Sequence, residues 1–159
     1  MEKDILSIHT VLCPLDFSEP SYKALQVAIE MATHFKAEVV LVHIVAPAAP
    51  PIPVGNVYAF AGTEEYEKAA KEGADKGLAT AIQRIPTWLN SRTAIATGDA
   101  ADEIVRLANT EAADLIVIAI HGLTGWRHLV FGSVAEKVTR LSDRPVLVIP
   151  AHDSEAKSG

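Results

Sequence analysis

Five short apolar runs alternate with longer segments of helical periodicity, and this alternation limits the fold more than any other feature of the chain. Strands that are apolar on both faces are typical of parallel sheets covered by helices on both sides. We therefore predict an α/β fold. A chain of 159 residues has the size of a single domain with a sizeable core. The predicted strands are Thr10–Cys13, Val39–Ile44, Arg92–Ala96, Leu115–Ile120 and Val146–Ile149.

Four helices are predicted between and after these strands. Ser18 is expected to cap the first, with Pro20 in the first turn, where a missing N–H costs no helical hydrogen bond. The second is predicted from about Thr63 to Ile85. Asp99 is expected to cap the third, and Ser133, followed three positions later by a glutamate, reads as a capping box for the fourth.

The remaining segments are predicted to lack regular structure. Residues Ala46–Gly62 are rich in proline and alanine and are predicted to form a long loop, of a length that is usually functional or mobile. We treat residues 1–150 as one domain and expect the polar tail, residues 151–159, to be disordered.

Composition argues against several classes of function. The net charge is −6 and the basic residues do not cluster, which argues against nucleic-acid binding. No apolar run approaches the length of a membrane span. The first residues do not show the basic start followed by an apolar stretch that would predict secretion. Cys13 is the single cysteine, so no internal disulfide can form, and we expect it to be buried. These features fit a reducing cytoplasm.

The connection after the fourth predicted strand carries the strongest functional signal. The strand ends at His121-Gly122, nine residues follow, and Gly132-Ser133 then opens a helix. Open α/β sheets bind ligands at the carboxyl ends of their strands. A helix N-terminus offers unpaired N–H groups and a positive dipole end, so phosphate is the expected anion there. A plain strand-loop-helix connection with turn glycines remains the alternative.

Two further positions lie on the same predicted rim. Asp16 follows the first strand directly and could accept from a ribose hydroxyl or an adenine amino group. Its alternative role is to bond nearby N–H groups of the loop. Thr97-Gly98-Asp99 ends the third strand, where a turn glycine before a helix cap is the simpler interpretation.

The histidines do not predict a metal centre. Neither His121 nor His128 has a cysteine, carboxylate or histidine at a metal-site spacing. We expect His121 to donate to a phosphate or to order its loop, and His128 to face solvent or the phosphate tail. His43 lies inside a buried strand and is predicted to be a hydrogen-bonded core residue.

Several catalytic motifs are missing from the sequence. It contains no glycine-rich loop ending in Gly-Lys-Ser/Thr, no glycine triplet after the first strand, and no G-x-S-x-G nucleophile elbow. We therefore do not expect efficient catalysis by any of those mechanisms.

Taken together, the motifs resemble those of the universal stress protein family over Ile8 to Pro150. The resemblance implies a five-stranded, flavodoxin-like (Rossmann-like) α/β sheet, commonly dimeric. The nucleotide-binding branch has a motif of glycine, two residues, glycine, nine residues, glycine, then serine or threonine. Gly122, Gly132 and Ser133 match it, whereas Ala119 replaces the first glycine. The segments that carry the resemblance are Val11–Ser18, Leu41–Val45, Thr97-Gly98, Ile118–Val138 and Arg144–Val148.

The resemblance also implies a site. Asp16 and Ile44 would meet the adenine and ribose, whereas the glycine-rich connection and the start of the fourth helix would meet the phosphates. Ala119 is the smallest departure from glycine, so we expect weakened binding rather than loss. The candidate nucleotide-binding residues are Pro14, Asp16, Ile44, Gly98, Ile118, Ala119, His121, Gly122, Gly132, Ser133 and Val134.

The sequence thus predicts a cytoplasmic, dimeric regulator that binds ATP or AMP, with magnesium for ATP, and hydrolyses slowly at most. The expected dimer contact is the edge strand Val146–Ile149. No nucleic-acid or membrane partner and no redox cofactor are expected. One alternative is a non-binding branch of the family, a regulatory or chaperone-like dimer with a vestigial pocket. A flavodoxin-like electron carrier is a second alternative, although Asp16–Pro20 lacks the Ser/Thr-rich phosphate loop that it needs.

Overall fold

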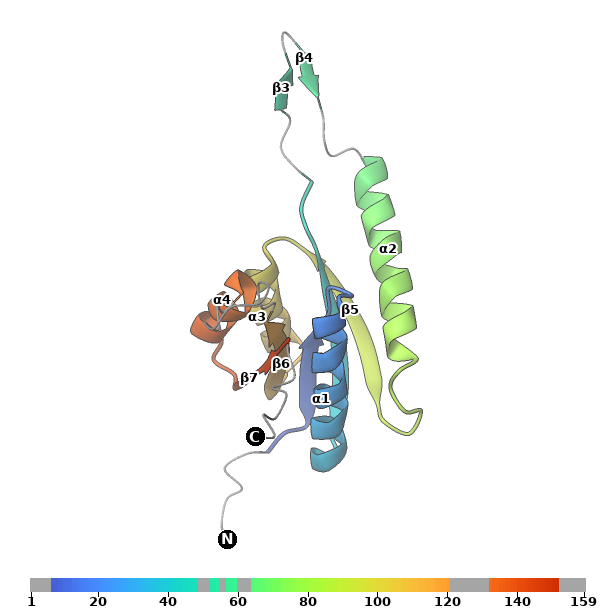
Figure 1. The fold of residues 1–159 in the computed structure, drawn as a ribbon, viewed down its shortest axis with the longest axis vertical. Helices are drawn as coiled ribbons and strands as arrows, with labels where there is room; N and C mark the ends of the chain where they lie inside the picture. Colours follow the sequence, from blue (N-terminus) through green and yellow to red (C-terminus); the bar gives the residue numbers. More distant parts are fainter. Residues whose placement is uncertain (1–6, 49–51, 55–56, 60–63, 121–131, 152–159) are drawn as a thin grey trace, which may run out of the picture.

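The sheet predicted from the sequence is present. The computed structural model describes residues 7–48, 52–54, 57–59, 64–120 and 132–151. Five parallel strands form one sheet in the order β5-β2-β1-β6-β7 (Figure 1). In chain order this is 3-2-1-4-5, the order of the Rossmann type among doubly wound sheets. The strands are β1 Thr10–Pro14, β2 Glu38–Val45, β5 Ser91–Thr97, β6 Leu115–Ile120 and β7 Val146–Pro150, each within one residue of its predicted bounds.

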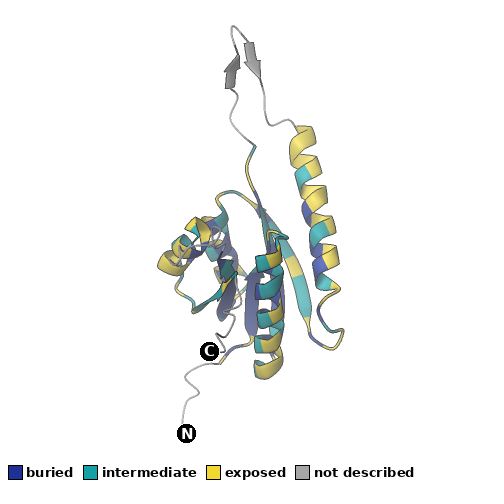
Figure 2. Ribbon diagram, viewed as in Figure 1, coloured by how far each residue is buried: buried dark blue, intermediate teal, exposed yellow. Residues whose placement is uncertain are grey.

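Helices cover both faces of the sheet, which confirms the predicted fold class. Successive strand residues point to opposite faces, so each strand contributes to two cores. On one face α1, Glu19–Phe35, and α2, Glu64–Ile82, pack on a core that includes Val11, Val39 and Val117. On the other, α3, Ala100–Thr110, and α4, Ser133–Leu141, pack on Leu12, Val40 and Ile116. Figure 2 shows the buried residues concentrated between these layers.

The helix ends follow the expected capping chemistry in two cases. The Ser18 hydroxyl accepts from the N–H of Ser21, and Pro20 lies in the first turn of α1. The Asp99 carboxylate accepts from the N–H groups of Ala101 and Asp102, both at 3.1 Å. Both predicted caps are confirmed.

Helix α2 ends three residues before the predicted limit. After Ile82 the α-helical hydrogen bonds give way to tighter turns, in which the N–H groups of Arg84 and Ile85 donate to carbonyls three residues earlier. Pro86 disfavours a helical conformation for the residue before it, which explains this early end.

The predicted cap of the fourth helix is wrong. Gly132 occupies the N-cap position, Ser133 is the first helical residue, and no side chain caps the helix. Gly132 has φ −58°, so its backbone does not require glycine. Ser133 therefore lies one residue past the cap, and the spacing from Ser133 to Glu136 does not form a capping box.

The predicted loop between Ala46 and Gly62 contains a β-hairpin. Strands β3, Ile52–Val54, and β4, Val57–Ala59, pair antiparallel and form a separate two-stranded sheet. In Figure 1 the hairpin lies apart from the main sheet. The Gly55-Asn56 dipeptide between two apolar triplets is a hairpin signal that the high proline content of the segment obscured.

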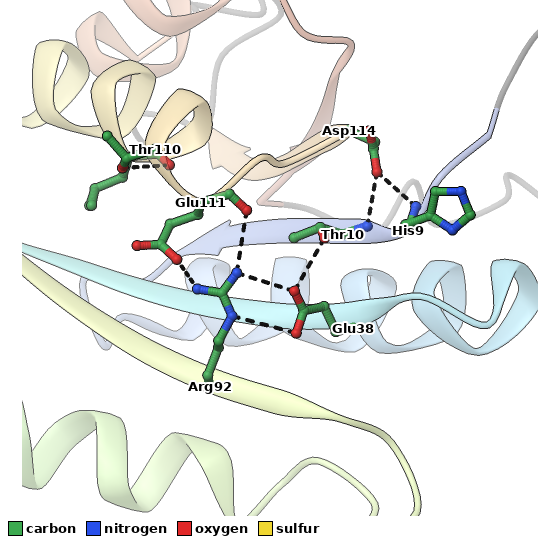
Figure 3. Close-up of polar contacts among 8 residues, drawn as sticks. His9, Thr10, Glu38, Arg92, Thr110, Glu111 and Asp114 are labelled. Carbon is green, nitrogen blue, oxygen red and sulfur yellow. Dashed lines mark hydrogen bonds and ion pairs between the residues drawn. The ribbon is translucent and has the colours of Figure 1, made fainter.

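Polar side chains tie the amino ends of the strands together (Figure 3). Arg92 of β5 donates to both carboxylate oxygens of Glu38 of β2, at 3.1 and 3.4 Å, and also pairs with the Glu111 carboxylate after α3. The Asp114 carboxylate accepts from the N–H groups of His9 and Thr10 at the start of β1, at 2.8 and 3.1 Å. This network lies at the end of the sheet opposite the carboxyl ends of the strands.

We expect Arg92→Ala to lower the free energy of unfolding by about 1 kcal/mol. The Arg92 side chain is 42 % exposed, which limits the contribution of the two ion pairs, but their loss leaves Glu38 and Glu111 without that cation. The measurement is urea denaturation. Arg106→Ala, which removes an exposed pair within α3, is the control and should cost less. Equal losses of unfolding free energy in the two variants would contradict a stabilising role for the network.

Candidate functional site

A cavity of about 140 Å³ lies at the carboxyl ends of β1, β2 and β6. The chain runs from β1 to β2 and β5 on one side and then returns to β6 on the other side of β1. This reversal is the topological switch point at which doubly wound sheets bind ligands. The starts of α3 and α4 complete the wall. The lining residues are Pro14, Leu15, Asp16, Ser21, Val42, His43, Ile44, Ala100, Ile104, Ile118, Ala119 and Val134.

Six of the candidate residues named from the sequence line this one cavity. They come from four elements far apart in the chain and their ends: Pro14 and Asp16 from β1, Ile44 from β2, Ile118 and Ala119 from β6, and Val134 from α4. Gly132 and Ser133 lie immediately before Val134, at the start of α4. His121 and Gly122 lie outside the described residues, as does His128.

Gly98 is separate from the cavity lining. Its N–H donates to the Val45 carbonyl at 3.1 Å, and its φ of +153° is one that L side chains rarely adopt. A Cβ at this position would also lie 2.9 Å from Cγ of Glu103. These observations match the simpler interpretation of Gly98, a turn glycine ahead of the Asp99 cap.

Asp16 is exposed at the mouth of the cavity and is oriented by its own loop. Its Oδ1 accepts from the Ser18 N–H at 3.0 Å and from the Ser18 hydroxyl. The Ser18 hydroxyl in turn accepts from the N–H of Ser21, a buried residue of the cavity wall. The loop-bonding role considered for Asp16 is therefore present, and it holds this carboxylate beside the start of α1.

His43 is a lining residue that the sequence analysis placed in the core. It is half-buried, and its Nδ1 lies 2.7 Å from the Leu15 carbonyl oxygen. Because a carbonyl only accepts, Nδ1 carries the proton. The expected hydrogen bond is present, and the position of His43 near the end of β2 also makes it a residue of the cavity wall. Its proximity to the last residues of β2 was the available signal.

One cation joins the starts of the two helices beside the cavity. The Lys137 ammonium of α4 donates to carboxylates of Asp99 and Asp102 at the start of α3, both at 2.9 Å. The hydrogen bond from Lys137 lowers the pKa of Asp99, and the N–H groups at the start of α3 lower it further. The hydrogen bonds that Lys137 donates to Asp102 and Asp99 raise the pKa of Lys137. These two ion pairs therefore link α3 and α4, each of which supplies residues of the cavity wall.

The described residues contain no group of three histidine, cysteine or carboxylate side chains that could hold a metal ion. Within the same residues, no helix is both long enough and apolar enough to cross a membrane.

We expect Lys137→Met to raise the pKa of Asp99 towards its ordinary value, because the largest cause of the shift is removed. Since the folded-state pKa of Asp99 is lowered, its carboxylate stabilises the fold above its unfolded-state pKa, and this stabilisation is lost as the pH falls through the folded-state pKa. On acidification, the free energy of unfolding of the variant should therefore fall by less than that of the wild type. NMR titration of the carboxyl carbon measures the pKa, with Arg140→Met as the control on the same helix. An unchanged Asp99 pKa in Lys137→Met would contradict the ion pair.

Known proteins resemble this chain in sequence and in fold. The family model described as "Universal stress protein family" matches residues 7–150. Universal stress protein MJ0531 of Methanocaldococcus jannaschii is 32 % identical over 140 residues, which cover 87 % of this chain and 80 % of that protein. The solved structure of MJ0577, from the same organism, has a TM-score of 0.74 at 25 % identity and covers 94 % of this chain and 100 % of that one.

A second solved structure shares the fold and contains a nucleotide. It is the universal stress protein from Archaeoglobus fulgidus in complex with dAMP, with a TM-score of 0.59 at 22 % identity, covering 91 % of this chain and 99 % of that one. The family model spans nearly the whole described chain, and the architecture agrees with it. The chain therefore belongs to the universal stress protein family.

Proposed function

We propose that this protein binds an adenine nucleotide, ATP or AMP, in the cavity at the carboxyl ends of β1, β2 and β6. The observation that supports this most directly is the convergence of Pro14, Asp16, Ile44, Ile118, Ala119 and Val134 on one cavity at the switch point. The dAMP in the Archaeoglobus fulgidus relative belongs to the same ligand class.

The cavity walls suit one end of such a ligand. Ile44, Ile104 and Ile118 offer apolar contact to a base, and the Asp16 carboxylate at the mouth can accept from a ribose hydroxyl or an adenine amino group. The cavity is smaller than a typical pocket for a whole nucleotide, so the phosphates extend beyond it. We propose that they extend towards the start of α4, where the helix N-terminus at Gly132 and Ser133 favours an anion. By the family resemblance, His121 and Gly122 would also meet the phosphates.

The protein acts as a nucleotide-responsive regulator rather than as an efficient enzyme. Among the described lining residues, the titratable side chains are Asp16 and His43. The first accepts from Ser18 and the second donates to Leu15, so both are engaged in holding the loop. Hydrolysis is slow at most, and magnesium assists ATP binding by neutralising phosphate charge. The Cys13 thiol is completely buried, and that burial raises its pKa to about 12. A free cysteine fits the reducing cytoplasm in which we propose that the protein acts.

Ala119 supports a second candidate, a regulatory dimer of the same family with a vestigial pocket. The residue lines the cavity and is half-buried, so its methyl group occupies space that a glycine would leave open. Ala119 does not have a positive φ, so the backbone itself is compatible with either residue. The difference between the two candidates is therefore steric.

Thermal unfolding with and without nucleotide tests the proposal. A ligand that binds only the folded state, at a hundred times its dissociation constant, adds about 2.7 kcal/mol. For a domain of this size that corresponds to a rise in Tm of roughly 5–10 °C. ATP with magnesium should give this rise, AMP should also raise the Tm, and magnesium alone is the control. An unchanged Tm in millimolar ATP and magnesium would favour the vestigial pocket.

The variant Ala119→Gly separates the two candidates further. If the methyl group weakens binding, the variant should bind ATP more tightly than the wild type in a calorimetric titration. Equal affinities would show that Ala119 is harmless in a working site.

We also propose that the protein forms a homodimer through β7. This strand is at the edge of the sheet, and residues Val146–Ile149 are all partly exposed although apolar. Helix α2 packs against β2 and β5 at the other side of the sheet, so it does not cover this edge. An edge strand of this kind pairs readily with another chain, and pairing with its own copy gives a closed two-fold dimer.

We expect Val148→Lys to shift the protein from dimer to monomer in sedimentation velocity, because the charge blocks pairing along the edge. Val105→Lys is the matched control, since Val105 is also half-buried against the same core but lies on α3. It should remain dimeric if folded. A wild type that sediments as a monomer at tens of micromolar would refute the β7 interface.

A further inference from the structure

Phe17, which directly follows the lining residue Asp16, has a backbone conformation that is unusual for its residue type. Its φ is +65°, in the left-handed region, where an aromatic residue is a genuine outlier. Such a conformation costs free energy and persists only where several surrounding contacts enforce it. Phe17 directly follows Asp16, so the contacts that hold Phe17 also decide where the Asp16 carboxylate lies.

His43 provides the first of these contacts. The rings of Phe17 and His43 are stacked, with centroids 4.6 Å apart and planes inclined by 21°. The same imidazole donates from Nδ1 to the Leu15 carbonyl oxygen at 2.7 Å. One side chain of β2 therefore holds the loop after β1 at two points, Leu15 and Phe17, on either side of Asp16.

Gly77 of α2 provides the second contact. A Cβ atom built on Gly77 would lie 2.4 Å from Cζ and 2.6 Å from Cε1 and Cε2 of Phe17, which is far closer than real Cβ contacts. The end of the Phe17 ring therefore rests on the bare backbone of α2. Gly73, one turn earlier on the same helix, has no atom within 4 Å of its Cβ position. Gly77 is thus required for space, whereas Gly73 is not.

The ring cannot easily move aside to admit a side chain at Gly77. Its face lies against His43, and its backbone already has a strained conformation. Helix α2 is also tied to α1 near its end, where the Arg84 guanidinium lies 4.0 Å from the centroid of the Tyr22 ring. A methyl group on Gly77 must therefore displace Phe17, and Phe17 displaces the loop that carries Asp16.

We infer that Gly77, Phe17 and His43 form a positioning unit that sets the affinity of the cavity for an adenine nucleotide by fixing the loop from Leu15 to Phe17. This inference rests on the proposed function of the cavity. Phe17 and Gly77 are positioning residues, because they act on the ligand through Asp16 and the cavity wall. Helix α2 thereby becomes part of the binding site without lining it.

The test compares Gly77→Ala with Gly73→Ala. Both replace a glycine of α2 by a residue of higher helix propensity, and only the first meets Phe17. We expect Gly73→Ala to bind ATP with magnesium as the wild type does and to unfold at a slightly higher temperature. Gly77→Ala should bind on the order of tenfold more weakly in calorimetric titration, since small misplacements of a site have effects of this size or larger. Equal affinities in the two variants would overturn the inference.

A second readout reports the unit without nucleotide. Stacking on Phe17 changes the chemical shifts of the His43 ring protons, and the Nδ1 proton is hydrogen-bonded to the Leu15 carbonyl. The resonances of both kinds of proton can be measured by NMR. Gly77→Ala should alter both signals, and Gly73→Ala should alter neither. Unchanged His43 signals in Gly77→Ala would overturn the inference. A wild type that binds no nucleotide, with the His43 signals changing as expected, would instead overturn the proposed function.

Further variants keep the test valid if Gly77→Ala does not fold. Phe17→Leu removes the stacked ring and should weaken ATP binding on the order of tenfold; in that background Gly77→Ala should add little further loss. His43→Asn retains a hydrogen-bond donor for the Leu15 carbonyl, so this variant should bind ATP more tightly than His43→Ala does. Additive losses for Phe17 and Gly77, or equal losses for the two His43 variants, would contradict a coupled unit.

Discussion

The packing of β1 between two strands and two helical layers is the constraint on which the other features depend. Val11, Leu12 and Cys13 are completely buried, and β1 pairs with β2 on one edge and β6 on the other. A strand with both edges and both faces occupied cannot shift by one residue, since every side chain would then exchange its core. The strand therefore delivers Pro14 and Asp16 to a fixed place, which is where the chain reverses direction across the sheet.

The two ends of the sheet have different roles: one carries a network of ion pairs and hydrogen bonds, and the other carries the cavity. At the amino ends, Arg92, Glu38, Glu111 and Asp114 join strand starts and the loop after α3 by charge-assisted hydrogen bonds. At the carboxyl ends, backbone groups and apolar side chains surround a cavity, and the polar contacts there orient the loop after β1.

The sequence predicted those features that depend on local chemistry. The apolar runs identified all five strands of the sheet, of which β1, β2 and β6 are largely buried and β5 and β7 are partly exposed. Ser18 and Asp99 were recognised because capping requires their side-chain oxygens. Gly132 as the cap of α4 and the hairpin at Ile52–Ala59 were missed, because glycine caps without a side chain and prolines obscured the strand pattern. The lining role of His43 was missed because the apolar run around it predicts a core position, although its place near the end of β2, just past the last residue paired with β1, puts it at the rim.

The backbone strain at Phe17 shows why the cavity wall depends on residues that do not line it. A left-handed aromatic residue is unfavourable alone, so the loop after β1 would relax if its ring lost either neighbour. The stacked His43 belongs to β2, and the bare backbone at Gly77 belongs to α2. Three elements must therefore be in place before Asp16 has a defined position. The cavity is consequently a property of the packed α2 layer as well as of the strand ends, and a substitution on a partly exposed helix can alter it.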